Sequence, residues 1–282
     1  MSQRTQITAL SLALSLVFAA AAHAGPREDA QAENAVRVLA EIQAIPESSI
    51  PDKLLDEAKA IVIVPDTIKA GLVLGGRRGH GVLAVRTADG GWSNPGFVTL
   101  TGGSIGLQVG VQSADVVLVF RSERGLDSIV NGKFTLGADA GVAAGPMGRN
   151  AAAATDGQMK AEIWSWSRAR GLFAGVALDG AVLSMDNKAN EAVYGQDTTP
   201  RMILEGRASQ EPSPAIAGFR TRLAEASASA RAARVDDDAL APTPAVAGPT
   251  IDTTTTTTVE PQPQPFQPVE NPAKVEALPV TP

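Results

Sequence analysis

Eighteen of the 27 glycines lie between residues 71 and 148, and many of them fall inside segments that otherwise have the composition of β-strands. Glycine weakens a flat strand, but it lets a sheet bend sharply and lets neighbouring backbones approach closely. Candidate strands recur here at spacings of about 8–12 residues, with turn signals between them. This pattern predicts a strongly curved antiparallel sheet or a closed, barrel-like β core.

Helices are expected to flank this core. Apolar side chains at three-and-four spacing predict an amphipathic helix over residues 30–45, and Pro51 begins a second helix over 51–58. Short β-branched runs predict strands over residues 60–64, 70–74, 82–86, 96–101, 105–112, 116–121, 133–140, 162–168, 172–178 and 181–185. Further helices are expected over 122–130, 187–194 and 214–232. The predicted fold class is therefore α+β.

Both ends of the chain have compositions that are not typical of a folded domain. Residues 1–24 have the pattern of a secretory signal: Arg4, an apolar run, and Ala22-His23-Ala24 as a cleavage site that would leave Gly25 as the mature N-terminus. Residues 236–282 are rich in proline and threonine and are expected to be disordered. The predicted domain is residues 25–235, in an exported protein.

The charge balance and the small number of cysteine and histidine residues exclude several classes of function. Residues 25–235 hold 22 basic and 23 acidic side chains, so a strongly basic nucleic-acid binder is not expected. The chain has no cysteine and two histidines, and His23 belongs to the signal, which leaves His80. Because nucleophile and imidazole combinations are so few, we predict no enzymatic activity, no cofactor and no metal site.

Two glycine-rich motifs have both a chemical and a structural interpretation. Residues 102–106 fit the G-x-S-x-G pattern of a hydrolase, but a strand is expected after Ser104 and His80 precedes it, which favours a hairpin turn. Residues 75–81 could hold a phosphate with backbone N–H groups, or form a flexible hairpin with solvated arginines. The pairs Gly75-Gly76, Gly90-Gly91 and Gly102-Gly103 are predicted to mark turns.

The segment from Trp164 to Arg170 carries the most informative local pattern. If it is a strand, Trp164, Trp166, Arg168 and Arg170 share one face. Two tryptophans followed by two arginines suit a surface where an apolar layer meets phosphates. The alternative is that the tryptophans pack in the core beside unrelated, exposed arginines.

A series of motifs follows one order along the chain: Ala60–Pro65, Lys69–Gly71, Gly75–Leu83, Thr99–Gly106, Gln108–Gly110, Asp115–Phe120, Gly132–Asp139, Ala144–Arg149, Arg170–Gly175 and Leu178–Gly180. Together these motifs resemble the SYLF lipid-binding domain family. The similarity covers about residues 50–197.

The resemblance implies a non-enzymatic domain that binds lipid headgroups, which are phosphoinositides in eukaryotic members, some of which also bind actin. An exported protein has no access to actin, so we expect anionic phospholipid or phosphorylated lipid headgroups at an envelope membrane, with peripheral attachment in the periplasm. The alternative is an envelope structural or protein-interaction module whose proline-rich tail reaches a partner protein. From charge and face, the candidate lipid-binding residues are Lys69, Arg77, Arg78, Arg149, Trp164, Trp166, Arg168 and Arg170.

Overall fold

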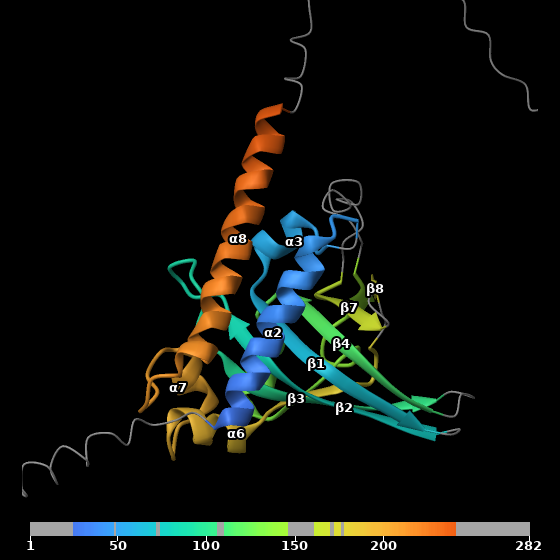
Figure 1. The fold of residues 1–282 in the computed structure, drawn as a ribbon, viewed down its shortest axis with the longest axis vertical. Coiled ribbons are helices and arrows are strands. Elements are labelled where there is room, and N and C mark those ends of the chain that lie inside the picture. The colour runs from blue at the N-terminus through green and yellow to red at the C-terminus, as the bar shows by residue number, and fades with distance from the viewer. Residues whose placement is uncertain are drawn as a thin grey trace, which may run out of the picture. The chain divides into compact units, whose positions relative to one another are not determined.

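The computed structural model describes residues 25–47, 49–71, 74–105, 110–145, 161–169, 172–175 and 178–240 (Figure 1). The helices are α2 (Pro26–Ala44), α3 (Asp52–Glu57), α4 (Arg124–Asn131), α6 (Asn187–Tyr194), α7 (Pro200–Leu204) and α8 (Pro214–Leu240). The strands are β1 (Ala60–Gly71), β2 (Leu74–Val85), β3 (Gly96–Ile105), β4 (Gly110–Phe120), β5 (Lys133–Thr135), β6 (Val142–Ala144), β7 (Ile163–Ala169), β8 (Leu172–Gly175) and β9 (Val182–Met185).

These strands form one sheet in the order β5-β9-β3-β2-β1-β4-β7-β6, and β8 also pairs with β7. The pairs are antiparallel except β6 with β7, which makes the sheet mixed. Strands far apart in this order meet through their side chains, since the rings of Phe120 in β4 and Phe134 in β5 have centroids 6.1 Å apart. The sheet is therefore curled into a half-barrel flanked by helices, which confirms the predicted α+β class with a strongly curved β core.

The central strands are longer than the sequence pattern predicted. Strands β1 to β4 are between 10 and 12 residues long, and Gly76 of β2 lies opposite Gly103 of β3. The turns predicted at Gly75-Gly76 and Gly102-Gly103 are wrong, because hydrogen bonding to neighbouring strands offsets the weak strand preference of glycine. The pair Gly90-Gly91 does lie in the β2–β3 turn, where Gly90 has φ of +84°.

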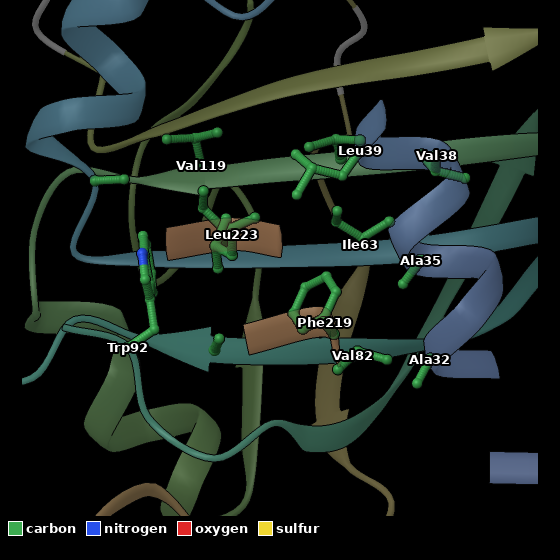
Figure 2. Packing of buried hydrophobic residues seen from close by; sticks show 14 of the residues in the cluster. Ala32, Ala35, Val38, Leu39, Ile63, Val82, Trp92, Val119, Phe219 and Leu223 are labelled. Atoms are coloured by element: carbon green, nitrogen blue, oxygen red, sulfur yellow. The ribbon is translucent and has the colours of Figure 1, made fainter. Parts of the chain in front are cut away.

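One hydrophobic cluster lies between the sheet and the helices α2 and α8 (Figure 2). Helix α2 begins at Pro26, four residues before its predicted start, and buries the apolar stripe that the sequence pattern indicated. Figure 2 shows Phe219 and Leu223 of α8 packed over Val82 and other strand residues. Each fully buried aliphatic or aromatic side chain contributes about 1.5–3 kcal/mol, so this layer is a main source of stability in a chain without disulfides.

A second cluster lies on the opposite, concave face of the sheet. It joins Val62 and Leu83 of the central strands to Phe134, Ile163 and Leu183 from strands towards the two ends of the sheet order. Side chains alternate between the two clusters along each strand, as the period of two requires. The face on which a residue lies can therefore be read from its position relative to these core residues.

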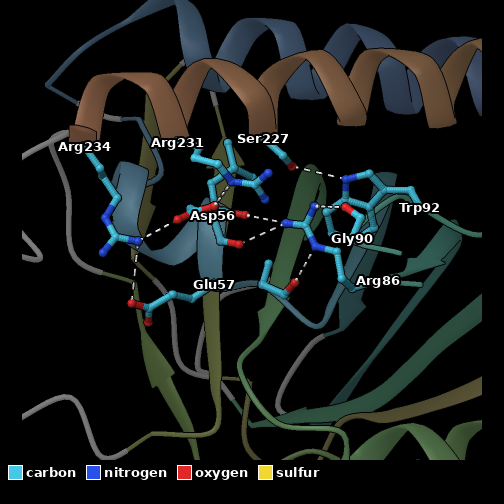
Figure 3. A network of polar contacts seen from close by, with 10 residues as sticks. Asp56, Glu57, Arg86, Gly90, Trp92, Ser227, Arg231 and Arg234 are labelled. Atoms are coloured by element: carbon cyan, nitrogen blue, oxygen red, sulfur yellow. Dashed lines mark hydrogen bonds and ion pairs between the residues drawn. The ribbon is translucent and has the colours of Figure 1, made fainter. Parts of the chain in front are cut away.

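Polar contacts connect α8 to helix α3 and to the turn between β2 and β3 (Figure 3). Asp56 of α3 pairs with Arg231 at 2.9 Å and with Arg234 at 2.6 Å. Trp92 donates its indole N–H to Ser227 at 3.2 Å, and the Arg86 guanidinium lies 4.1 Å from the centroid of the same ring. These contacts hold α8 in place while its last turns continue to Leu240, five residues past the predicted domain boundary.

Two shorter helices, α6 and α7, pack against strand β3. Helix α6 ends before Gly195, as predicted, and Asn190 makes two hydrogen bonds to the backbone of Phe97, at 2.8 and 3.1 Å. Helix α7 was not predicted. The expected signal at residues 1–24 and the tail from residue 241 onward lie outside the described residues. Among the helices of the described ranges, none combines the length and apolarity needed to cross a bilayer.

Candidate basic surface on the arm

The candidate site is the outer half of the β1–β2 pair, which we call the arm and define as residues 65–71 and 74–80. In Figure 1 these strand ends extend to the lower right, and their tips lie beyond the helices. Lys69 lies opposite Arg77, and Ile68 lies opposite Arg78, in the antiparallel register. The structure thus brings together three of the basic residues that the sequence analysis selected.

A β-bulge separates the arm from the core part of β1. Ile63 pairs with Val82 but Ile68 pairs with Arg78, so β1 holds one extra residue between these positions. Asp66 lies in the bulge with φ of +48°, and its backbone N–H donates to Asp115 Oδ1 at 3.0 Å. An extra residue reverses the alternation of side chains beyond it.

The arm carries positive charge on both of its faces. The register between β2 and β3 is uninterrupted from Leu74 to Leu83, so Arg78 lies on the same helix-side face as Val82, and Arg77 lies on the concave face with Leu83. Directly opposite residues of an antiparallel pair share a face. Lys69 therefore accompanies Arg77, and Ile68 accompanies Arg78.

Arg77 is the most unusual of these cations. It is half-buried, and desolvation lowers the pKa of its guanidinium. No acidic side chain of the described residues forms an ion pair with it. A partly desolvated guanidinium without an ion-pair partner among the described residues is a candidate site for an anion.

Exposed apolar side chains lie next to the cations. Ile68 is 52% exposed and Val111 of β4 is 74% exposed. Val111 pairs with Ala70 of β1, so Val111, Ala70 and Ile68 share the helix-side face with Arg78. The arm therefore combines positive charge with accessible apolar area.

An open groove of about 650 Å³ runs between the first turns of α2 and the arm. Its volume is in the range of small-molecule sites. Helix α2 contributes Arg27, Ala30, Gln31 and Asn34, and the arm contributes Pro65, Asp66, Ile68, Ala70 and the stretch from Gly76 to His80. His80 Nδ1 lies 3.1 Å from Asp186 Oδ2, and this contact orients the imidazole at the groove.

The tryptophan strand lies elsewhere, and the membrane-facing role predicted for it needs correction. Trp164, Trp166 and Arg168 do share one face of β7, but that face lies against the helix-side core. Trp166 is fully buried and Trp164 is half-buried. An interfacial position for Trp166 is therefore wrong, and the core-packing alternative describes it.

Arg168 differs from the alternative prediction of an exposed arginine that is unrelated to the core. Its guanidinium contacts Asp115 Oδ2 at 2.8 Å and also contacts Glu41 of α2. Asp115 is nearly buried, with a side chain 5% exposed. Arg168 thus joins α2 to β4 and β7, and it does not belong to the arm. Arg149 and Arg170 lie outside the described residues.

The described residues of the two glycine-rich motifs lie in strands, and Gly106 lies outside the described residues. Residues 75–81 lie within β2, which pairs with β1 and β3 on its two sides, so a backbone N–H cradle for phosphate does not form there. Ser104 lies in β3 opposite Gly75, and the next described element is the strand β4, whereas a nucleophile elbow leads from a strand into a helix. Within the described ranges, no three His, Cys, Asp or Glu side chains gather as metal ligands would.

Residues 101–226 match the family model Ysc84, described as Las17-binding protein actin regulator. This part of the chain is similar to the Ysc84 (SYLF) family. The resemblance inferred from the sequence motifs is confirmed, and the matched range includes the second half of β3, the strands β4 to β9, the helices α4, α6 and α7, and the first half of α8.

Named relatives have a similar region within larger proteins. Protein YSC84 of Saccharomyces cerevisiae is 38% identical over 168 residues, which are 58% of this chain and 36% of that protein. The LAS seventeen-binding protein 3 of the same yeast is 36% identical over 170 residues, 59% of this chain and 36% of its own length. The human SH3 domain-containing YSC84-like protein 1 is 33% identical over 193 residues, 66% of this chain and 55% of the human protein. The chain thus matches between about a third and just over half of these relatives.

Sequence reasoning missed the contribution of α2 to the site, and α2 lies outside the range that the family model matches. Arg27, Ala30, Gln31 and Asn34 recur at helical spacing, which does place them on one face. The sequence alone does not show what this stripe faces, because the arm that completes the groove lies more than thirty residues further along the chain.

Proposed function

We propose that this domain is a non-enzymatic binder of anionic membrane lipids, and that it attaches peripherally to an envelope membrane through the arm. The observation that carries the proposal is the set of three cations, Lys69, Arg77 and Arg78, beside exposed apolar residues. Placement in the periplasm follows from the signal-like pattern of residues 1–24. Anionic phospholipid or the phosphates of lipid A would be the ligands available there.

The distribution of charge and apolar side chains on the arm supports an orientation in which the edge of the strand pair enters the headgroup layer. Cations on both faces can reach phosphates on either side of the inserted strands, and Ile68 and Val111 can enter the acyl boundary. Charged residues near an anionic surface contribute about 1 kcal/mol each, and this attraction is screened by salt. Binding should therefore depend on both lipid charge and ionic strength.

Replacing Lys69, Arg77 and Arg78 together with alanine is expected to weaken binding to phosphatidylglycerol vesicles by about two orders of magnitude, from about 1 kcal/mol per charge. Vesicle co-sedimentation at low and at high salt measures this loss, which should shrink as salt rises. The matched control replaces three exposed cations away from the arm, Lys133, Arg207 and Arg222. Equal losses in both triple variants would show that net charge, rather than the arm, controls binding.

Arg77 alone offers a second, more selective test. Arg77→Met keeps the aliphatic stem but removes a charge that is desolvated without a partner among the described residues, so the melting temperature is expected to stay the same or rise. Binding to anionic vesicles is expected to weaken about fivefold. Thermal unfolding and co-sedimentation on the same protein give both quantities. A fall of several degrees in melting temperature would mean that Arg77 has a structural role instead.

A second candidate function is binding of a protein partner. It is favoured by the matched family's description as an actin regulator and by the relatives named for binding Las17. In an envelope setting the partner would be another protein, reached in part through the proline-rich tail. Co-sedimentation with filamentous actin and pull-down from an envelope fraction test this candidate. Binding there, with no vesicle binding at any salt concentration, would replace the lipid proposal.

A further inference from the structure

We propose that the groove between α2 and the arm holds one single-chain anionic amphiphile, meaning an acyl or alkyl chain that ends in a carboxylate or phosphate. The inference rests on the proposed lipid function and adds a defined site to it. The acyl or alkyl chain of one amphiphile would lie in the groove beside the arm, in addition to the contacts that the surface of the arm makes with lipid headgroups.

The walls of the groove suit a chain. Ala30 on α2 and Ile68 and Ala70 on β1 present apolar side chains, and Gly76 presents none, so a Cβ added at Gly76 would meet nothing within 4 Å. The missing side chain leaves open space at this wall. An apolar chain laid along these residues would cover Ile68, whose exposure is otherwise unexplained by the core.

The polar groups of the groove suit an anionic head. Arg27 and Arg78 line opposite walls, and neither forms an ion pair with an acid of the described residues. Asp66 is the one acidic side chain in the lining. A carboxylate or phosphate between the two guanidinium groups would satisfy both by charge-assisted hydrogen bonds.

Gln31 provides an independent observation. Its side-chain Nε2 is buried and has no hydrogen-bond partner, and Gln31 lines the groove from α2. A buried donor left unsatisfied costs stability, and such a group is normally paired in the functional state. A side-chain rotation of Gln31 toward the groove would let an oxygen of the bound head accept this hydrogen bond.

Titration calorimetry with dodecanoate and dodecyl phosphate, both below their critical micelle concentrations, tests the inference on the mature full-length chain. We expect saturable binding at one molecule per protein, tightening about fourfold for each CH₂ group added between octanoate and dodecanoate. The neutral dodecyl maltoside is expected to bind at least tenfold more weakly. Comparison of dodecanoate with dodecyl phosphate shows which anionic head the groove prefers.

Two substitutions fill the groove from opposite walls without changing charge. Ala30→Trp and Gly76→Val are each expected to weaken dodecanoate binding at least tenfold while the melting temperature stays unchanged, since Ala30 is exposed and Gly76 has open space. Ala224→Trp, on the exposed side of α8, is the matched control and should bind like the unaltered protein.

The outcomes separate this inference from the function on which it rests. Loss of dodecanoate binding in both filled variants, with the control unaffected, supports the groove. Vesicle binding without saturable dodecanoate binding, or dodecanoate binding that survives both substitutions, overturns the groove and leaves the arm proposal in place. Absence of both kinds of binding overturns both proposals, and equal binding of dodecyl maltoside overturns the anionic head.

Discussion

Replacing Trp166 with alanine is expected to lower the free energy of unfolding by about 3–5 kcal/mol, the usual cost of deleting a buried aromatic side chain. Trp166 is fully buried between β4 and the helix-side core, so a large cavity would remain. Urea denaturation of the mature protein measures the change. Binding to anionic vesicles, measured where the variant is still folded, should be unaffected.

Two further variants sharpen this prediction. Trp166→Phe keeps most of the apolar volume and should cost clearly less than alanine. Gly145→Ala should also destabilise, because its added Cβ would overlap the indole ring of Trp166. If Trp166→Ala instead left stability intact and abolished vesicle binding, Trp166 would be an interfacial residue after all.

The second large effect is expected at the ion pairs beneath α2. Arg168→Ala would leave the nearly buried carboxylate of Asp115 without its closest cation, since Arg37 lies 4.0 Å away and the remaining contact described above is the Asp66 N–H. Removing one partner of a buried pair costs more than removing both. We expect a loss of about 2–4 kcal/mol, reduced from the fully buried case because Arg168 is 20% exposed.

A double-mutant cycle tests this assignment. Adding Asp115→Asn to Arg168→Ala removes the uncompensated charge but keeps an acceptor for the Asp66 N–H, so at least about 1 kcal/mol should be recovered. The control, Arg222→Ala, breaks an exposed pair with Glu225 and should cost less than about 0.5 kcal/mol. Additive losses in the cycle, or a cost for Arg168→Ala no larger than the control, would mean that the pair is not coupled.

The elements predicted from the sequence were those whose signal is local. The apolar stripe of α2 and the β-branched start of β1 depend on a few neighbouring residues, and both lie where they were expected. The shared face of Trp164, Trp166 and Arg168 was also predicted correctly, because alternation is a property of a single strand. The layer that covers this face was not predictable, since it comes from α2, more than a hundred residues earlier.

The errors at the glycine pairs have the same origin. Gly75-Gly76 and Gly102-Gly103 have the composition of turns, and only their pairing with each other and with β1 makes them strand residues. The groove was missed because it needs both the helical stripe of Arg27 and the register of the arm. The bulge at Asp66 has no clear signal in the sequence, yet it decides which face Ile68 and Lys69 occupy.

That bulge has a consequence for how proteins of this fold can change. Core packing on one side of Asp66 and the proposed ligand contacts on the other are carried by the same two strands, but the extra residue separates their side-chain patterns. Substitutions in the arm can alter charge and apolar area without repacking Val62 or Ile63. Deleting one residue here would exchange the two faces of the outer part of β1 at a single step. The charge and apolar area of the arm can therefore change while the half-barrel stays the same.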